Sequence, residues 1–212
     1  MKRFFVILMT ALMLGWVGVV SADTAAAEKV VRDNAQKVLN ILSDNKDKVK
    51  EDPQFLYRLV NEVILPNVDF DAMSKLVLAK NWRSANDDQR KRFVEEFKGM
   101  LVRTYTNSLT DYAGNTEILY LKSVDKKEGK YVTVYTEIVQ SGKPNIPVDY
   151  SLHQTSEGYK IYDVVIEGLS LVKNYRTSFS KQISETSLDS LIEDMAQKNS
   201  KGQVKNARLH FG

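Results

Sequence analysis

The stretch that decides the fold is "TEILYLKSVDKKEGKYVTVYTEIVQ", residues 116 to 140. Residues 116–124 and 131–140 are rich in valine, isoleucine, threonine and tyrosine, which are among the residues most enriched in β-strands. The polar run 125–129 between them ends in glycine and is short enough for a hairpin connection. The stretch therefore predicts two neighbouring antiparallel strands.

Two more segments continue this pattern toward the C-terminus. Residues 146–155 and 159–167 have a similar composition, and the turn-forming runs "SGKPN" and "SEG" precede them. Connections this short join antiparallel neighbours, because a parallel pair needs a crossover of about a dozen residues or more. We expect a four-stranded antiparallel sheet in which each strand pairs with the next.

On both sides of the strand region the apolar residues are spaced for helices. They recur every three or four positions, which is the spacing of one helical face. Three helix starts have capping signals: Asp52 before Pro53, Asp69, and Asn86 with Gln89 in capping-box spacing. We expect helices near residues 26–42, 53–66, 69–77, 86–112, 169–183 and 187–198. The predicted class is α+β, with about six helices around the sheet.

The second predicted strand has apolar side chains on both faces. Val132 and Val134 fall on one face, whereas Tyr131 and Tyr135 fall on the other. An antiparallel sheet that is covered on one side only has polar residues on its other side. Either helices cover both faces of this sheet, or one face lines a cavity that an apolar ligand fills.

The N-terminus has the pattern of an export signal. Lys2 and Arg3 precede an uncharged apolar run over residues 4–20, and small residues lead up to Asp23. This order predicts a signal peptide over residues 1–22, cleaved after Ala22, with an uncleaved membrane anchor as the alternative. The remainder is expected to form a single domain over residues 23–199, followed by a disordered tail over 200–212.

Composition excludes several classes of protein. The chain has 30 basic and 27 acidic residues, for a net charge of +3, and its basic clusters are mixed with acidic or polar residues. A nucleic-acid-binding protein usually has a basic face, so we expect no nucleic-acid partner. Cysteine is absent, which excludes a disulfide framework and a lipoprotein anchored through cysteine.

A serine in an apolar context invites comparison with hydrolases. Ser170 lies in "GLSLV", but a nucleophile elbow has a second glycine where this chain has Val172. The two histidines, His153 in a predicted strand and His210 near the end of the chain, do not fit a triad with this serine. We expect the Ser170 hydroxyl to cap the helix that follows it.

The sequence gives little support for a metal site, a phosphate-binding loop or another kind of catalytic site. No group of side chains has metal-ligand spacing, and no glycine-rich phosphate-binding loop occurs. Asp163 and Glu167 fall on one face of the last predicted strand and form a possible carboxylate pair, although Glu167 is better placed to hold the following turn. We therefore predict no catalytic residue, no metal site and no cofactor.

The C-terminal half of the chain contains the most specific motif. The segment "YDVVIEGLSLVKNYRTSFSKQI", residues 162–183, resembles the tail motif of the MlaC or toluene-tolerance family of periplasmic phospholipid carriers. The matching positions are Asp163, Glu167, Gly168, Ser170, Asn174, Tyr175, Arg176 and Phe179. "LP" at 65–66 and "NDDQRKRFVEEF" at 86–97 support the resemblance, which extends over about Val30 to Met195.

This resemblance implies both a fold and a function. The fold is a curved sheet wrapped by helices, related to the nuclear-transport-factor-like cone, with an apolar cavity for the acyl chains of a diacyl phospholipid. The function is a soluble periplasmic carrier that exchanges lipid with an outer-membrane lipoprotein complex and an inner-membrane transporter complex. The family has no catalytic residues, and we expect this chain to be a monomer.

We expect eleven residues to form the cavity wall, although each fits an ordinary core equally well. The sheet candidates are Val132, Val134, Tyr150, Leu152, Val164 and Ile166, and the helix candidates are Met100, Leu101, Tyr105, Leu169 and Val172. Arg176 is expected to pair with Asp163 or Glu167, or else to reach a lipid phosphate. Two other functions stay open: an enzyme for a hydrophobic substrate with Asp163 as base, and an adaptor whose interior is solidly packed.

Overall fold

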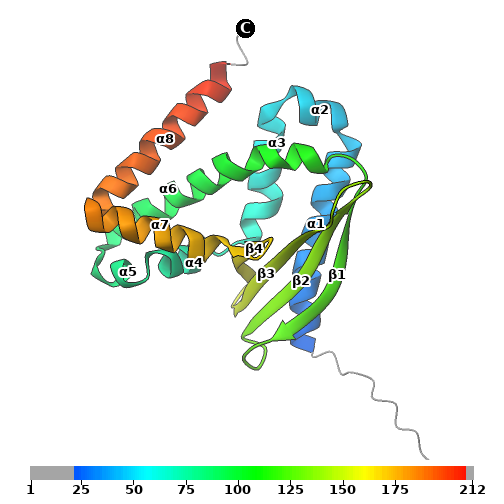
Figure 1. Ribbon diagram of the computed structural model, residues 1–212, viewed down its shortest axis with the longest axis horizontal. Helices are drawn as coiled ribbons and strands as arrows, with labels where there is room; N and C mark the ends of the chain where they lie inside the picture. Colours follow the sequence, from blue (N-terminus) through cyan, green and yellow to red (C-terminus); the bar gives the residue numbers. More distant parts are fainter. Residues whose placement is uncertain (1–21, 209–212) are drawn as a thin grey trace, which may run out of the picture.

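The computed structural model describes residues 22 to 208, and the side chains of residues 23 to 201. Its strands form one antiparallel sheet in the order β1-β2-β3-β4-β5, so that each strand lies beside the next one in the chain (Figure 1). The strands are β1 (Thr116–Asp125), β2 (Tyr131–Gln140), β3 (Ile146–Thr155), β4 (Gly158–Ile166) and β5 (Leu169–Ser170). The predicted α+β class and antiparallel pairing are confirmed. The predicted signal peptide lies outside the described residues, except for Ala22.

The sheet has five strands rather than the predicted four. The short strand β5 places Leu169 opposite Ile166 of β4. Glu167 and Gly168 connect these strands with positive φ angles of 49° and 80°, as the central residues of a type I′ hairpin turn do. Because this turn reverses the chain, the next helix begins at Leu171 and not at the predicted position 169.

The described residues form eight α-helices, two more than expected. They are α1 (Ala22–Asp44), α2 (Lys46–Glu51), α3 (Pro53–Leu59), α4 (Phe70–Leu78), α5 (Lys80–Ser84), α6 (Asp87–Tyr105), α7 (Leu171–Glu185) and α8 (Leu188–Arg208). The additional helices α2 and α5 have six and five residues. Fewer than two helical turns do not display a period of 3.6 residues.

Two predicted helices change their geometry before they end. Helix α3 continues as a π-helix, η1 (Val60–Ile64), and a 3-10 helix, η2 (Leu65–Asn67), while α6 continues as a 3-10 helix, η3 (Thr106–Tyr112). Within η3, the side chain of Thr110 donates to the carbonyl of Asn107 at 2.8 Å. Such local bonds compete with regular α-helical hydrogen bonds.

The predicted helix caps are confirmed. Asp52, Asp69 and Asn86 precede α3, α4 and α6, and each accepts a hydrogen bond from a backbone N–H in the first turn. Asn86 and Gln89 form the complete capping box: the Asn86 side chain accepts from the Gln89 N–H at 2.8 Å, and the Gln89 side chain accepts from the Asn86 N–H at 3.1 Å. These caps fix where the helices begin.

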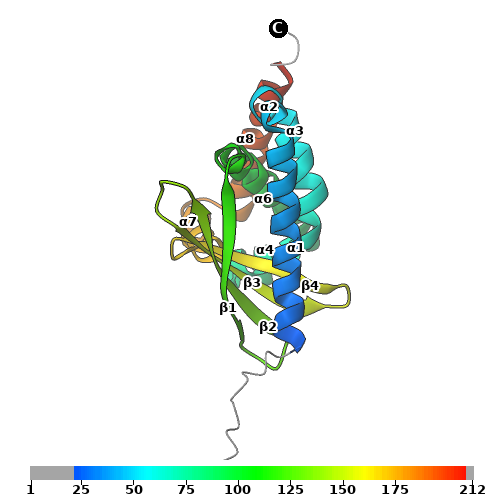
Figure 2. The same cartoon turned by 90° about the vertical axis from the view of Figure 1, so that its right-hand side faces the viewer.

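Helix α1 covers one face of the sheet (Figure 2). Ala27 and Val31 of this helix pack against Val132, Val134 and Leu152 from β2 and β3. The apolar residues on this face therefore form a core with one helix, whereas one of the two alternatives from the sequence placed helices over both faces.

The opposite face of the sheet has aromatic side chains that contact one another. The rings of Tyr131, His153 and Tyr162 lie with their centroids 5.6 to 6.4 Å apart, and Tyr131 is 40% exposed. The apolar pattern of β2 thus has two origins, a helix-covered core on one face and a partly exposed aromatic cluster on the other.

Helices α4, α6, α7 and α8 form a second layer beyond the end of the sheet (Figure 1). The rings of Phe93, Phe97 and Phe179 make the centre of its core, with centroids 5.5 to 5.9 Å apart. A smaller core under α2 and α3 contains Leu42 and Leu56. The apolar interior formed by the described residues is thus divided into three clusters.

The last helix is longer than the sequence indicated. Helix α8 includes residues 200–208. None of the described helices has the combined length and hydropathy of a transmembrane segment.

Candidate functional site

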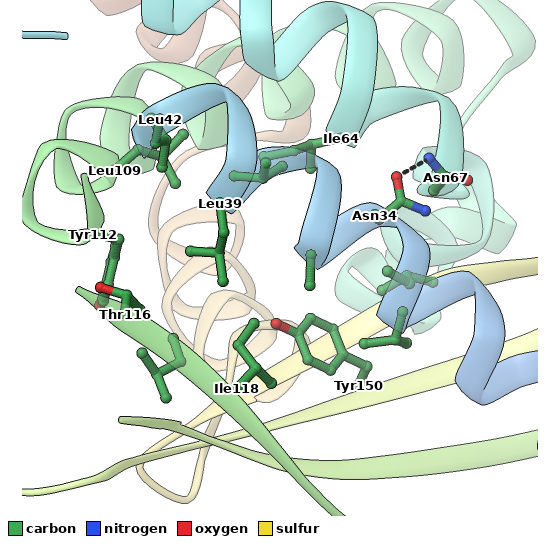
Figure 3. A pocket seen from close by; sticks show the side chains of 15 residues that line it. Asn34, Leu39, Leu42, Ile64, Asn67, Leu109, Tyr112, Thr116, Ile118 and Tyr150 are labelled. Atoms are coloured by element: carbon green, nitrogen blue, oxygen red, sulfur yellow. Dashed lines mark hydrogen bonds between the residues drawn. The ribbon is translucent and has the colours of Figure 1, made fainter. Parts of the chain in front are cut away.

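An apolar cavity of about 220 Å³ lies between α1 and the sheet. We call it the sheet cavity. Helix α1 contributes Leu39 and Leu42, and the strands contribute Ile118 and Tyr150, whose side chains point toward one common space (Figure 3). An apolar cavity of about 150 Å³ is already large enough to hold benzene, so the sheet cavity has room for part of a hydrocarbon chain.

A second apolar cavity of about 220 Å³ lies between β4 and the helices α4, α6 and η3. We call it the helix cavity. Val164 and Ile166 form its sheet side, while Met73, Leu101 and Tyr105 form its helix side. It lies between the sheet layer and the helical layer.

Two side chains separate the cavities. Ile64 and Leu109 line both of them. Ile64 is the last residue of the π-helix η1, and Leu109 lies within the 3-10 helix η3. Segments of this kind often mark functional sites and hinges in helices. The partition between the cavities is therefore made by two side chains on irregular backbone.

The walls of both cavities are electrically neutral. No charged side chain of the described residues lines either cavity. Burial raises the pKa of the Tyr150 and Tyr112 hydroxyls above their ordinary range, so both phenols stay neutral at physiological pH. An uncharged wall suits a hydrocarbon ligand, whereas an ion in such a cavity would lose its hydration without gaining a partner.

Five of the eleven predicted wall residues line a cavity. Tyr150 faces the sheet cavity, and Leu101, Tyr105, Val164 and Ile166 face the helix cavity. The sequence predicted that α1 has an apolar face, but not that this face lines a cavity. The same spacing of apolar residues occurs in a helix that packs directly on a sheet without leaving a cavity.

The other six candidates lie elsewhere in the structure. Val132, Val134 and Leu152 are in the core beneath α1, and Met100 and Val172 belong to the helical core. Leu169 is 72% exposed, because β5 and its tight turn direct it away from the interior. The sequence therefore indicated which residues face the interior more reliably than which residues line a cavity.

The hydroxyl of Ser170 has a structural role. It accepts a hydrogen bond from the Lys173 N–H at 3.0 Å and donates one to Asp163 at 2.6 Å. This confirms the predicted cap of α7. His153 instead contacts Asp69 at 2.9 Å, so it is not available to Ser170 as a base, and His210 lies outside the described residues. No cluster of metal-binding side chains occurs in the part of the chain that the structure describes.

Asp163 fixes the corner between β4 and α7. Its second carboxylate oxygen accepts from the Val172 N–H at 3.0 Å, in addition to the bond from Ser170. A catalytic base would need a free oxygen in a cavity, and Asp163 lines neither cavity. The geometry thus favours a structural role over the enzymatic alternative.

Asp163→Ala is expected to lower the free energy of unfolding by about 3 kcal/mol or more, since it removes two hydrogen bonds and those to a charged group contribute roughly 1.5–3 kcal/mol each. Urea unfolding followed by circular dichroism measures this loss. Asp163→Asn is the matched control, because its amide oxygen still accepts from one donor and the loss should be smaller. Unfolding of Asp163→Ala at the wild-type urea concentration would contradict this role.

Arg176 has a different partner from those expected. Its Nε donates to the backbone carbonyl of Leu76 at 2.7 Å, and no ion pair with Asp163 or Glu167 is present among the described residues. Arg176 therefore connects α7 to the end of α4.

Comparison with known proteins identifies relatives of this chain. The family model described as "MlaC protein" matches residues 32–197. The toluene tolerance protein ttg2D of Pseudomonas putida is 28% identical over 182 residues, which are 84% of this chain and 81% of that protein. The intermembrane phospholipid transport system binding protein MlaC of Haemophilus influenzae is 23% identical over 97% of both chains.

A solved structure has the same fold. The phospholipid-binding protein from Ralstonia solanacearum, determined in complex with a phospholipid, superposes with a TM-score of 0.76. It is 24% identical, and the match covers 84% of this chain and 98% of that one.

Proposed function

The chain belongs to the MlaC family, and from this premise we propose that it is a periplasmic carrier that shelters phospholipid acyl chains in its two cavities. The observation that supports this most strongly is the pair of neutral, apolar cavities that share Ile64 and Leu109. Ligand pockets usually have volumes of about 300–1,000 Å³. Each cavity alone is smaller than this, whereas the two together fall within the range.

The energetics explain why a carrier needs such cavities. At about 0.8 kcal/mol for each buried methylene, an acyl chain of about 14 carbons gains on the order of 11 kcal/mol by leaving water. A free phospholipid therefore crosses an aqueous space far too slowly to be useful. Apolar walls cover the chain without directional bonds, so the carrier can return the lipid to a membrane.

The export pattern at the N-terminus and the names of the relatives support a role between two membranes. In this proposal the protein receives and delivers lipid at an outer-membrane lipoprotein complex and at an inner-membrane transporter complex, and it works as a monomer. The adaptor alternative required a solidly packed interior, and the two cavities count against it.

Uptake of lipid from vesicles tests this function. Delipidated protein is mixed with vesicles of phosphatidylethanolamine and phosphatidylglycerol, separated from them by size exclusion, and extracted with organic solvent for mass spectrometry. We expect phospholipid to elute with the protein. Protein that folds normally and elutes without phospholipid at every vesicle concentration would refute the carrier function.

A further inference from the structure

The side-chain hydroxyl of Thr106 is buried at the wall of the helix cavity. Thr106 is the first residue of η3 and is only 1% exposed. Its Oγ1 atom has no hydrogen-bond partner among the described residues. A buried hydroxyl without a partner costs about 1–3 kcal/mol, so its retention at this position needs a physical reason.

Neighbouring threonines show that local backbone partners exist in this part of the chain. Thr104 donates to the Met100 carbonyl at 2.7 Å, and Thr110 donates to the Asn107 carbonyl at 2.8 Å. Both of these side chains are exposed. Thr106 faces the cavity instead, and the carbonyl of Val102, four residues earlier, accepts from its backbone N–H.

Other polar groups nearby do not explain the arrangement. Tyr105 also lines the helix cavity, but its hydroxyl is hydrogen-bonded to Tyr175, whose pKa is raised by burial and by this contact. Ser74 has the second unpartnered buried hydroxyl of the described residues, yet it lines neither cavity. Thr106 is therefore the residue of the helix-cavity wall whose hydroxyl has no partner among the described residues.

We propose that Thr106 donates a hydrogen bond to an ester carbonyl oxygen of the lipid whose acyl chain occupies the helix cavity. This inference rests on the proposed carrier function. The ester carbonyl is the polar group nearest to the hydrocarbon of an acyl lipid, and a threonine hydroxyl is a suitable donor to it. A site with a buried donor disfavours an analogue that lacks the acceptor, because the donor is then left unpaired. Thr106 thus selects ester-linked over ether-linked chains.

A competition between matched lipids tests this selection. Delipidated protein is offered equal amounts of diester and diether phosphatidylglycerol with the same chain lengths, and the bound lipids are counted by mass spectrometry. Wild-type protein should prefer the diester lipid by about fivefold to tenfold, the effect of one neutral hydrogen bond. Thr106→Val keeps the side-chain shape but removes the donor, so it should bind both lipids equally. Thr106→Ser keeps the hydroxyl and should keep the preference.

The outcomes separate this inference from the function on which it rests. Equal binding of both lipids by the wild-type protein, or a preference that persists in Thr106→Val, would overturn the role of Thr106 and leave the carrier function intact. Failure of the wild-type protein to bind either lipid would overturn the carrier function itself. The wild-type comparison needs no variant, so equal binding of both lipids overturns the role of Thr106 even if Thr106→Val does not fold.

Discussion

Leu109→Trp is expected to reduce the phospholipid bound by the purified protein by about tenfold or more. Leu109 lines both cavities, so the larger indole side chain occupies the space where they approach each other. Extra bulk in a filled apolar site costs roughly 1–3 kcal/mol, and 1.4 kcal/mol already corresponds to about a tenfold change in affinity. Mass spectrometry of solvent extracts, with the lipid normalised to protein, measures the change.

Leu169→Trp is the matched control for this variant. It introduces the same side chain, but at a position that is 72% exposed and lines neither cavity. Its lipid content should equal that of the wild-type protein. If Leu109→Trp folded and retained wild-type lipid, or if both variants lost lipid equally, the two cavities would not be the binding site.

Phe97→Ala is expected to lower the free energy of unfolding by about 3–5 kcal/mol, the usual cost of removing a buried phenylalanine ring. Phe97 is fully buried, and its ring contacts those of Phe93, Tyr175 and Phe179 at centroid distances of 5.4 to 5.9 Å. Phe97 lines neither the sheet cavity nor the helix cavity, so truncation opens a void within the packed helical layer. Guanidinium unfolding gives the change in free energy.

Leu121→Ala provides the comparison for the core variant. Leu121 is 57% exposed at the bulge in β1, and surface substitutions usually change stability by no more than about 0.5 kcal/mol. A loss of under about 1 kcal/mol in Phe97→Ala would show that the ring cluster is not the tightly packed core described above.

The sheet was predictable because its determinants are local. The turn-forming runs at 125–129 and 141–145 separate strands whose composition is distinct from that of the helices, and the observed strands differ from the predicted ones by a residue or so at their ends. The caps at Asp69 and Asn86 were predictable for the same reason, since a cap depends on residues within one turn. The short strand β5 was missed because two residues are too few to show the alternation of apolar and polar side chains that marks a strand.

The cavity wall depends on packing that a sequence does not display. Val134 and Tyr150 are directly opposite each other in the pairing of β2 with β3, and their side chains lie on the same face. Val134 is completely buried beneath α1, whereas Tyr150 lines the sheet cavity. Alternation along a strand gives the face of a side chain, but the path of α1 across that face decides whether the side chain meets protein or open space.

The irregular helices were missed for a related reason. The apolar residues of 60–64 and 106–112 fit an α-helical face, because π and 3-10 segments differ from it by less than one residue per turn. These segments position Ile64 and Leu109 between the cavities. The spacing of apolar residues therefore says least about η1 and η3, the two segments that lie between the cavities.

Native mass spectrometry of protein purified without detergent or solvent tests the central claim most directly. We predict that the main species exceeds the mass of the polypeptide by that of bound phospholipid, and that collisional activation releases this lipid intact. A spectrum that shows only the bare polypeptide, both before and after incubation with vesicles, would contradict the assignment of the two cavities as a shelter for acyl chains.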